Sequence, residues 1–563
     1  MMDLYLRVGS VTDKDVMLEV ESYIIAFALH CFDHQPVKVH YYMEVLEVTP
    51  LIHCCPAILD GWTKTDRPDS IVCTQKCPVT LVSKSERLTV LGLCSILRAT
   101  LYKSSTKDSS NIASKLLGFR QGCLMAPAEA SVWTQFCEVD MPDALKAILE
   151  WHGDRWSIPI ALLRFDVHLS LPARIHNVRK RAQELSLCDS SPSTNVLGLS
   201  DNLHTYAEGP DMVLSDLILF SLFSVFRNLC GTDILNQNIP RVMEWYRKCV
   251  QVEPKFNKVS EMVLKVKKLK FSKVEIPTFE EQSIYKRDPR RYKPSNRIFT
   301  RQEDVDQVLG MFPIDVMIPY TEKEEKGYQL EWNSLSRHIT PHDYLPTKRL
   351  ERKMQQLENM VSAVMNLCQP GSIIVDFCSG GGHLGIILAA LLPSNTVILV
   401  ENKEESLKRA RQRAMSAHIR NLDFYQSNLD YFDRPFDIGM ALHACGMASD
   451  LVLQKCISHQ ASFVICPCCY GSVSPANSAV YPQSQKFKRY ISGSEYIVLA
   501  HSADQTHDEE HPKTLQGRLC MQAVDSDRLF SAEELGYAVQ LSRMTPPGSS
   551  PKDHVLVGIF SKL

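Results

Sequence analysis

The sequence contains no uninterrupted apolar run long enough to cross a membrane. Its longest apolar stretch, Val213 to Phe226, is broken by Asp216 and by three serines, whereas a membrane-spanning helix needs about 20 apolar residues. The opening residues, MMDLYLRVGS, also lack the basic and apolar regions of a signal peptide. These absences lead us to expect a soluble protein that is neither secreted nor embedded in a membrane.

The sequence also lacks a large net charge of either sign and a regular cysteine framework. Its 62 lysines and arginines nearly balance 64 aspartates and glutamates, for a formal net charge of −2, so any nucleic-acid-binding surface must be local. The 19 cysteines are odd in number and irregularly spaced, which indicates a reducing compartment, and we expect a cytoplasmic protein. The final Ser561-Lys562-Leu563 matches a peroxisomal address; the alternative is that it only ends the strand-like stretch HVLVGIF.

Four regions of different character divide the 563 residues. Residues 1–125 alternate short strand-like and helix-like stretches, which predicts a small α/β domain. Residues 126–256 have a helical pattern, and residues 257–345 are charge-rich with little apolar periodicity, as in a linker or connection. From 346 to 563 strands and helices alternate, which favours a doubly wound α/β domain.

Two segments of the helical region point to a known family. EGPDMVLSDLILFSLF and NIPRVMEWYRKCVQVEPKF resemble the acid-capped core helix and the proline-led closing helix of the glutathione transferases. The resemblance implies the all-α C-terminal domain of that family at 126–256 and a thioredoxin-like N-terminal domain at 1–125. It also implies that Asp216 is a buried acid that caps its helix, and that Cys77–Pro78 in CPVTLV is a cis peptide.

The residues that would bind glutathione are missing from this half. In glutathione transferases a Glu-Ser pair holds the γ-glutamyl group, because its carboxylate and ammonium need charged or hydroxyl partners. Gly92 and Leu93 stand at the equivalent positions and offer no such groups. After the first strand, only Ser10 and Thr12 could replace the tyrosine that stabilises the thiolate. We therefore expect no glutathione conjugation and, by analogy, a module for a protein partner or for self-association.

The segment IIVDFCSGGGHLGIILAA, residues 373–390, predicts a strand, a tight glycine turn and a helix. This arrangement places backbone N–H groups at a helix N-terminus, where they can bind an anion, and glycine lets a ligand approach the backbone. Gly380, Gly382 and Gly385 fit the G-x-G-x-x-G pattern of dinucleotide-binding proteins. Glu401 ends the next strand, TVILVE, where an acid would bind the ribose hydroxyls.

An acid at the end of the first strand separates two cofactor classes. Asp376 would repel a pyrophosphate, whereas it would attract the ammonium and the sulfonium of S-adenosylmethionine. The residues from Asp376 to Gly382 resemble motif I of the class I methyltransferases, D-x-G-x-G-x-G, with Cys378 in place of the first glycine. The resemblance implies a Rossmann-like domain at 346–563 that binds S-adenosylmethionine. The cofactor-binding residues it implies are Asp376, Cys378, Gly380, Gly382, Glu401 and Asn428, the last of which would contact the adenine amino group.

The fourth and fifth predicted strands of this domain end in LHACG and PCCYG. Both segments resemble methyltransferase domains found beside RNA-modifying and uncharacterised proteins. Because the carboxyl ends of parallel strands face the ligand crevice, we predict that His443 and Tyr470 orient or deprotonate the methyl acceptor. The alternative for His443 is a structural histidine at a strand end.

Five residues of these two strand ends carry metal-ligating atoms: His443, Cys445, Cys466, Cys468 and Cys469. Thiolates and imidazoles suit zinc, but the spacings H-x-C and C-x-C-C depart from the usual C-x₂₋₄-C. We therefore expect no metal and interpret these residues as small side chains that line a cofactor crevice, with zinc as the alternative.

The motifs do not specify the methyl acceptor. Residues 285–297, YKRDPRRYKPSNR, place basic side chains beside two tyrosines, a pattern that suits contacts with RNA phosphates and bases. Charge-rich linkers are also commonly just solvated. The preferred hypothesis is an S-adenosylmethionine-dependent methyltransferase with RNA as a candidate acceptor and without membrane association. The alternatives are a noncatalytic scaffold built from two degenerate enzyme folds and, least favoured, a glutathione transferase.

Overall fold

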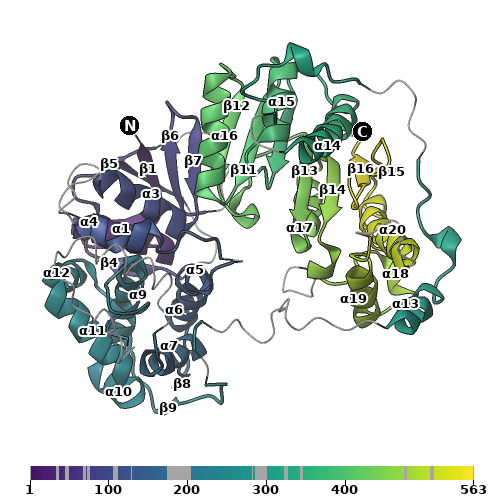
Figure 1. The fold of residues 1–563 in the computed structure, drawn as a ribbon. Helices are drawn as coiled ribbons and strands as arrows, with labels where there is room; N and C mark the ends of the chain where they lie inside the picture. Colours follow the sequence, from purple (N-terminus) through teal and green to yellow (C-terminus); the bar gives the residue numbers. More distant parts are fainter. Residues whose placement is uncertain are drawn as a thin grey trace, which may run out of the picture. The chain divides into compact units, whose positions relative to one another are not determined.

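The computed structural model divides the chain into two compact units, Met1–Arg287 and Asp288–Leu563, which are described separately (Figure 1). The boundary between them falls inside the segment 257–345, which the sequence predicts to be a connection. The residues that the structure describes are 2–32, 37–44, 50–66, 72, 77–105, 112–128, 130–173, 204–281, 283–285, 301–321, 328–342, 346–473, 479–506 and 513–561.

The first unit is built on a mixed sheet. Strand β1 (Asp3–Val11) runs parallel to β3 (Lys38–Met43) and antiparallel to β6 (Val79–Ser83), which pairs in antiparallel fashion with β7 (Leu88–Leu91). Helix α1 (Val20–Cys31) packs between the sheet and other helices, and it is apolar nearly all round because it has almost no face in water. The remaining strands are β2 (Val16–Leu18), β4 (Ile52–Cys54) and β5 (Thr63–Lys64), with β8 (Arg155–Ser157) and β9 (Lys273–Glu275) as a separate pair.

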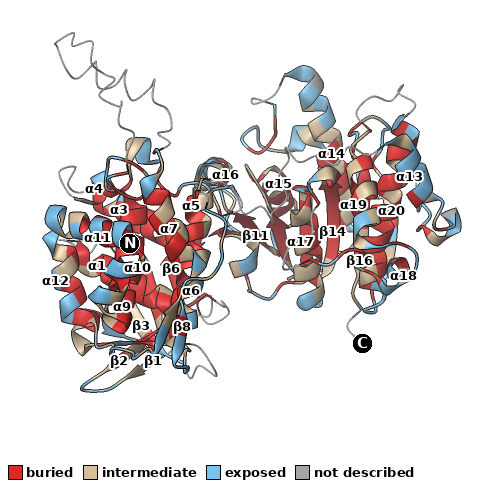
Figure 2. Ribbon diagram, turned by 90° about the horizontal axis from the view of Figure 1, so that it is seen from below, coloured by how far each residue is buried: buried red, intermediate tan, exposed pale blue. Residues whose placement is uncertain are grey.

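Helices form the rest of the first unit around α9 (Leu214–Cys230). This helix is buried along most of its length and contacts α1, α6, α11 and α12, which gives the buried core that Figure 2 colours red. No single helix among the described residues has the length and composition of a membrane span; only the pair α9 and α10, bent by 112°, meets those criteria together. The other helices are α3 (Leu93–Ser105), α4 (Ile112–Leu116), α5 (Val132–Gln135), α6 (Met141–Leu149), α7 (Ile160–Ser170), α10 (Thr232–Asn238), α11 (Pro240–Val252) and α12 (Pro254–Val263).

Asp216 in the first turn of α9 is a fully buried acid with three hydrogen bonds. Its carboxylate accepts from the backbone N–H groups of Ala207 and Val213, at 2.8 and 2.9 Å, and from the indole Nε1 of Trp245 at 2.8 Å. The bond from Val213 satisfies a donor that the start of the helix would otherwise leave unpaired. The bond from Trp245 links α9 to α11. The prediction of a buried, helix-capping acid is therefore confirmed.

The turn before β6 does not contain the predicted cis peptide. The cis peptide bonds among the described residues are Tyr481–Pro482 and Thr545–Pro546, both in the second unit. Cys77–Pro78 is trans, and the prediction for it is wrong. The Pro78 carbonyl instead accepts a hydrogen bond from the Arg7 N–H at 2.8 Å, which continues the pairing of β1 with the segment that leads into β6.

The second unit is a Rossmann-like α/β domain with the strand order β15-β16-β14-β13-β10-β11-β12 (Figure 1). The strands from β14 to β12 are parallel, and β16 is antiparallel to both of its neighbours. The chain order reverses between β10 and β13, and an open α/β sheet binds its ligand at the carboxyl ends of the strands at such a point. The strand bounds are β10 (Ile373–Phe377), β11 (Thr396–Glu401), β12 (Leu422–Gln426), β13 (Ile438–Cys445), β14 (Ser462–Cys468), β15 (Ala538–Arg543) and β16 (His554–Ile559).

Helices pack against this sheet in two groups. Helix α15 contacts both α14 and α16, whereas α17 contacts α20. The central strands are almost wholly buried, which explains their continuous runs of Ile, Leu and Val. The helix bounds are α13 (Gln302–Leu309), α14 (Thr347–Met365), α15 (His383–Leu391), α16 (Glu404–Ser416), α17 (Met447–Ser458), α18 (Gln485–Lys488), α19 (Gly493–Ser502) and α20 (Lys513–Glu533).

Two parts of the predicted connection 257–345 instead belong to the compact units. Residues up to Val263 belong to α12. Helix α13 and the residues after it place Val305, Val308 and Phe312 in a buried cluster with α19 and α20. Val305, Val308 and Phe312, with Leu309, have the i, i+3, i+4, i+7 spacing of a short amphipathic helix, a signal that the sequence analysis missed among the surrounding charges.

Two predictions concern residues outside the described part of the chain. They are the last two residues of the C-terminal tripeptide, Lys562 and Leu563, and residues 286–300, which hold most of the basic segment. The stretch HVLVGIF before the tripeptide does form the final strand, β16, as predicted.

Candidate functional site

The glycine turn between β10 and α15 has backbone conformations that glycine adopts most easily. Gly380 and Gly382 have φ angles of +55° and +71°, and a Cβ on Gly382 would lie 2.5 Å from Leu399 Cδ2. A Cβ on Gly380 would meet nothing within 4 Å, so there is open space beside this part of the turn. Cys378 has φ +54°. It adopts the left-handed conformation of the glycine it replaces, at the cost of local strain.

Asp376 lies near the end of β10 and is 2 % exposed. Its Oδ2 accepts a hydrogen bond from the Gly385 N–H in the first turn of α15, at 3.0 Å. Burial raises the pKa of Asp376 to about 7, while the hydrogen bond from Gly385 and the charge of Lys353 act in the opposite direction. The carboxylate is therefore held in place by the helix but is not fully compensated in charge.

Glu401 ends β11 and supports the same turn. Its Oε2 accepts from the Gly380 N–H at 2.7 Å, and its Oε1 accepts from the Lys403 N–H at 2.9 Å. Because a carboxylate oxygen can accept more than one hydrogen bond, both oxygens keep acceptor capacity for a ligand. The structure thus places Glu401 at the glycine turn, where the sequence analysis expects a ribose-binding acid.

Lys353 is a cation of the site that the sequence analysis missed. It comes from α14 and interacts electrostatically with Asp376, His383 and His443. Burial lowers the pKa of Lys353, and Asp376 acts against that shift. Among the described residues its ammonium has no hydrogen-bond or ion-pair partner. The only sequence signal was its place on an amphipathic helix before the motif, which does not distinguish it from its charged neighbours.

Arg413 on α16 is a second missed residue, and it holds the glycine turn from the other side. Its guanidinium donates to the Gly381 carbonyl and to His383 Nδ1, both at 2.8 Å, and also to the carbonyls of His338 and Ile339. Burial, followed by the charges of Arg413 and Lys353, lowers the pKa of His383 to about 3. His383 is therefore a neutral hydrogen-bond acceptor at the start of α15.

Asn428 lies two residues beyond the strand that was predicted to end at it. Strand β12 ends at Gln426, and Asn428 follows in the loop, where its Oδ1 accepts from Asn402 Nδ2 at 3.3 Å. Since Asn402 directly follows Glu401, this contact places Asn428 beside the carboxyl end of β11. The amide is half-buried and keeps both donor and acceptor capacity.

His443 sits near the end of β13 at a break in the strand register. The pairing with β14 shifts between Leu442 and Ala444, and His443 has φ +67°. Gln356 of α14 donates its amide to the Ser549 carbonyl and accepts from His443 Nε2 at 2.9 Å, so the imidazole proton is on Nε2 and Nδ1 is unprotonated. Burial, aided by the charge of Lys353, lowers the pKa of His443 to about 4.

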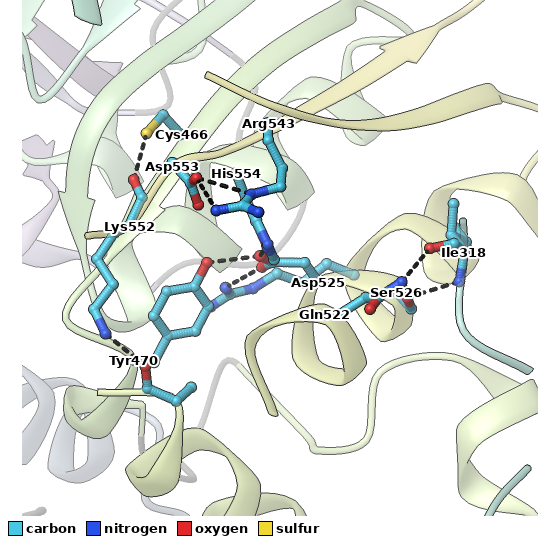
Figure 3. A network of polar contacts seen from close by, with 12 residues as sticks. Ile318, Cys466, Tyr470, Gln522, Asp525, Ser526, Arg543, Lys552, Asp553 and His554 are labelled. Atoms are coloured by element: carbon cyan, nitrogen blue, oxygen red, sulfur yellow. Dashed lines mark hydrogen bonds and ion pairs between the residues drawn. The ribbon is translucent and has the colours of Figure 1, made fainter. Parts of the chain in front are cut away.

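Tyr470 does not fit the predicted role at the acceptor. Its side chain is completely buried, and its hydroxyl donates to Asp525 Oδ2 at 2.6 Å, as Figure 3 shows. The same oxygen contacts His554 Nδ1 at 2.7 Å. The prediction for Tyr470 is corrected to a structural role, because a hydroxyl inside a buried network joining α20 to β16 is not available to a substrate.

Three of the five residues considered as metal ligands come together at the ends of β13 and β14. Cys445 Sγ lies 3.3 Å from Cys468 Sγ and 3.6 Å from Cys469 Sγ. The hydrogen bond from Cys468 lowers the pKa of the Cys445 thiol to about 6. His443 is held by Gln356, and the buried Cys466 Sγ contacts the Lys552 carbonyl instead. These two residues are not part of the cluster.

Comparison with known proteins gives one family match and several relatives. A family model described as a methyltransferase domain matches residues 352–476. The "Glutathione S-transferase C-terminal domain-containing protein homolog" of Drosophila pseudoobscura pseudoobscura is 39 % identical over 498 residues, which cover 84 % of this chain and 83 % of the relative. The protein of the same description from Drosophila melanogaster is 35 % identical over 598 aligned positions, covering 99 % of both chains.

A shorter match involves an enzyme that acts on RNA. The "23S rRNA (uracil(1939)-C(5))-methyltransferase RlmD" of Aliivibrio fischeri is 25 % identical over 128 residues. The match covers 23 % of this chain and 28 % of that enzyme.

Proposed function

This chain belongs to the family of glutathione S-transferase C-terminal domain-containing proteins, and on that premise we propose that it is an S-adenosylmethionine-dependent methyltransferase. It contains a methyltransferase domain at 352–476, on a sheet whose strand order changes direction beside the glycine turn. Function depends on the site and not on the fold alone, so the proposal rests on the residues around that turn.

The arrangement of charges around the glycine turn carries the proposal. S-adenosylmethionine has an ammonium, a sulfonium and a carboxylate. Asp376 and Glu401 supply two carboxylates for the cationic groups, and Lys353 supplies a positive charge for the carboxylate of the donor. A pyrophosphate cofactor would bring its negative charges beside both acids, which electrostatics disfavours.

The polar atoms of the site also suit the nucleoside part of the donor. We assign the ribose hydroxyls to Glu401, whose oxygens each keep a free acceptor position. We propose that the adenine amino group donates a hydrogen bond to the Asn428 side-chain carbonyl oxygen. The open space beside Gly380 lets the ligand come close to the backbone of the turn. Each assignment uses an atom that already has a fixed position, so the site requires little reorganisation to bind.

When bound, the donor supplies an electrophilic methyl group, and the chain must supply proximity and a place for the acceptor's proton. His443 is the residue we propose for the proton. Its Nε2 is fixed by Gln356, which leaves Nδ1 to accept. With a pKa of about 4 the imidazole is a weak base. Such a base suits an acceptor atom that loses its proton late, when its bond to the transferred methyl carbon is already forming and the proton has become acidic.

RNA is the acceptor we propose. The support is the match to a methyltransferase named for 23S rRNA and the basic composition of residues 286–297. Tyr285 does not belong to that support. Its ring packs against Trp133 and His168, and its hydroxyl donates to the Glu208 carbonyl inside the first unit.

We assign the first unit an interaction role and no glutathione chemistry. The positions expected to hold the γ-glutamyl group are Gly92 and the buried Leu93 at the start of α3. Thr12, one of the two possible substitutes for the missing tyrosine, uses its hydroxyl in a turn with Asp15. The first unit is well packed but lacks the glutathione-binding groups. A GST-like scaffold that binds a protein partner or a second copy of the chain explains both features.

Titration calorimetry of the full chain with S-adenosylmethionine and with glutathione tests the proposal. We expect the methyl donor to bind at a single site and glutathione to release or take up no heat. Binding of neither ligand would contradict the methyltransferase assignment and support a noncatalytic scaffold. Binding of glutathione would overturn the interpretation of the first unit.

A further inference from the structure

Cys445, Cys468 and Cys469 form a cluster of three thiols, and we propose that this cluster binds a zinc ion. The sulfur atoms of the three residues all lie within 4.8 Å of one another. The site adds to the proposed methyltransferase function and does not depend on it, because none of the three thiols belongs to the residues assigned to the methyl donor.

Two features of the backbone bring the three thiols together. Cys445 and Cys468 are paired directly across the parallel strands β13 and β14, and the Gly446 N–H donates to the Cys468 carbonyl at 3.0 Å. Successive residues of an extended strand point to opposite sides. Cys469 departs from that rule because it has φ +53°, and its thiol therefore reaches Cys445 from the same side as that of Cys468.

The distances between the thiols match a metal site better than a disulfide. Four ligands at about 2.3 Å around a tetrahedral zinc ion lie about 3.8 Å apart, close to the observed 3.3 and 3.6 Å. Sulfurs in a disulfide are about 2.05 Å apart. A disulfide would also leave one thiol of the three unpaired, whereas one ion can use all of them.

The fourth coordination position would be open. His443 and Cys466, the other possible ligands nearby, are engaged with Gln356 and with the Lys552 carbonyl. Cys445 and Cys469 are exposed, so a water or a substrate atom could complete the tetrahedron. Three protein ligands and an open position are the arrangement found in catalytic zinc sites rather than in structural ones.

The surroundings of the cluster can compensate its charge. Three thiolates around Zn²⁺ leave one net negative charge, since a coordinating thiol is deprotonated. Lys403 interacts electrostatically with Cys445, and Lys552 with Cys468 and Cys469. Lys552 also pairs with Asp504 at 3.2 Å, and the Asp504 carboxylate, which acts against the thiolates of Cys445 and Cys469, offsets part of this compensation.

Metal analysis of the full chain tests the site. The protein is purified under reducing conditions and stripped with a chelator. It is then titrated with Zn²⁺, and in parallel with Co²⁺, whose thiolate charge-transfer and tetrahedral d–d absorption bands report sulfur ligands. We expect one equivalent of metal per chain with both signals. The single variants Cys445→Ser, Cys468→Ser and Cys469→Ser should each weaken Zn²⁺ binding by more than about a hundredfold.

Cys368→Ser is the matched control, because Cys368 is a half-buried thiol of the same unit that lies before β10. It should bind Zn²⁺ like the wild type, and circular dichroism of every variant checks that the fold is kept. Absence of thiolate–cobalt bands in the reduced wild type would overturn the proposal, as would full metal binding by the Cys445→Ser/Cys468→Ser/Cys469→Ser variant. Failure to bind S-adenosylmethionine would leave this result unaffected, so the two proposals are judged separately.

Discussion

Replacing Asp376 with Asn removes one charge from the proposed donor site while changing little else. The Asn oxygen can still accept the hydrogen bond from the Gly385 N–H, which Asp376 accepts at 3.0 Å, and the two side chains are nearly equal in size. A change in ligand binding by the variant therefore reports the loss of charge and not the loss of a contact.

The expected loss of affinity follows from the buried carboxyl. A hydrogen bond to a charged group contributes about 1.5–3 kcal/mol, so Asp376→Asn should weaken S-adenosylmethionine binding roughly tenfold to a hundredfold at pH 8. The pKa of about 7 sets a higher limit, of about a thousandfold. A donor that returned this pKa to its ordinary value of about 3.9 would gain about 4 kcal/mol from the ionised form.

The pH dependence gives the sharper test. Below pH 7 the Asp376 carboxyl of the free protein becomes protonated, so wild-type affinity should fall with pH and approach that of the Asn variant near pH 5.5. The variant itself should bind with nearly constant affinity. Calorimetric titrations at several pH values measure both curves. A wild-type affinity independent of pH, or equal affinities at pH 8, would refute the role of Asp376 as the donor's counter-charge.

The same carboxyl should make the folded protein less stable at high pH. A carboxyl whose pKa is higher in the folded than in the unfolded state favours folding when it is protonated, so its contribution is lost as pH rises from about 4 to 7. Asp376→Asn should therefore unfold at higher urea concentration than the wild type at pH 8, and this difference should shrink toward pH 5. A gain in stability with a loss of binding is typical of a functional residue.

Four further substitutions test other parts of the structure. Lys353→Gln should weaken S-adenosylmethionine binding about tenfold or more but leave adenosine binding unchanged, because adenosine has no carboxylate; equal losses for both ligands would refute this role. Asp216→Ala should destabilise the first unit by at least about 3 kcal/mol in urea unfolding, because three buried donors lose their acceptor. Gly382→Ala should destabilise the second unit by about 2–4 kcal/mol, since its Cβ would lie 2.5 Å from Leu399 Cδ2, whereas Gly380→Ala should cost about 1 kcal/mol; limited proteolysis compares the two.

Much of the second unit was predictable because its signals are local. A strand, a glycine turn and a helix follow one another within residues 373–390, and the structure places β10, the turn and α15 there. Asp376 and Glu401 were predictable at the turn because each ends a strand of a parallel sheet, and such strand ends meet at one edge. In the first unit, Asp216 was predictable because a helix start needs an acceptor for its free N–H groups.

The wrong predictions concern residues whose role in the folded structure differs from the role that their local sequence suggests. Helix α13 is a single short amphipathic stretch within a charge-rich segment, and the overall composition of that segment favoured a connection, yet Val305 and Val308 are buried against α19 and α20. Tyr470 follows a strand end and has a polar hydroxyl, so the sequence favoured a functional role. The structure buries it against Asp525, a residue 55 positions away that no local pattern connects to it.

The sequence by itself determined the order of strands and helices, the glycine turn and the acids beside it, because backbone conformation and strand ends depend on neighbours in the chain. The tertiary structure alone decided which distant side chains share the site: Lys353 and Gln356 from α14, and Arg413 from α16. It also decided that Cys469 reaches Cys445, through a single left-handed residue that reverses the alternation of a strand. These side chains meet because helices and strands pack against one another, and the hydrophobic periodicity of a single helix or strand does not show which other element it packs against.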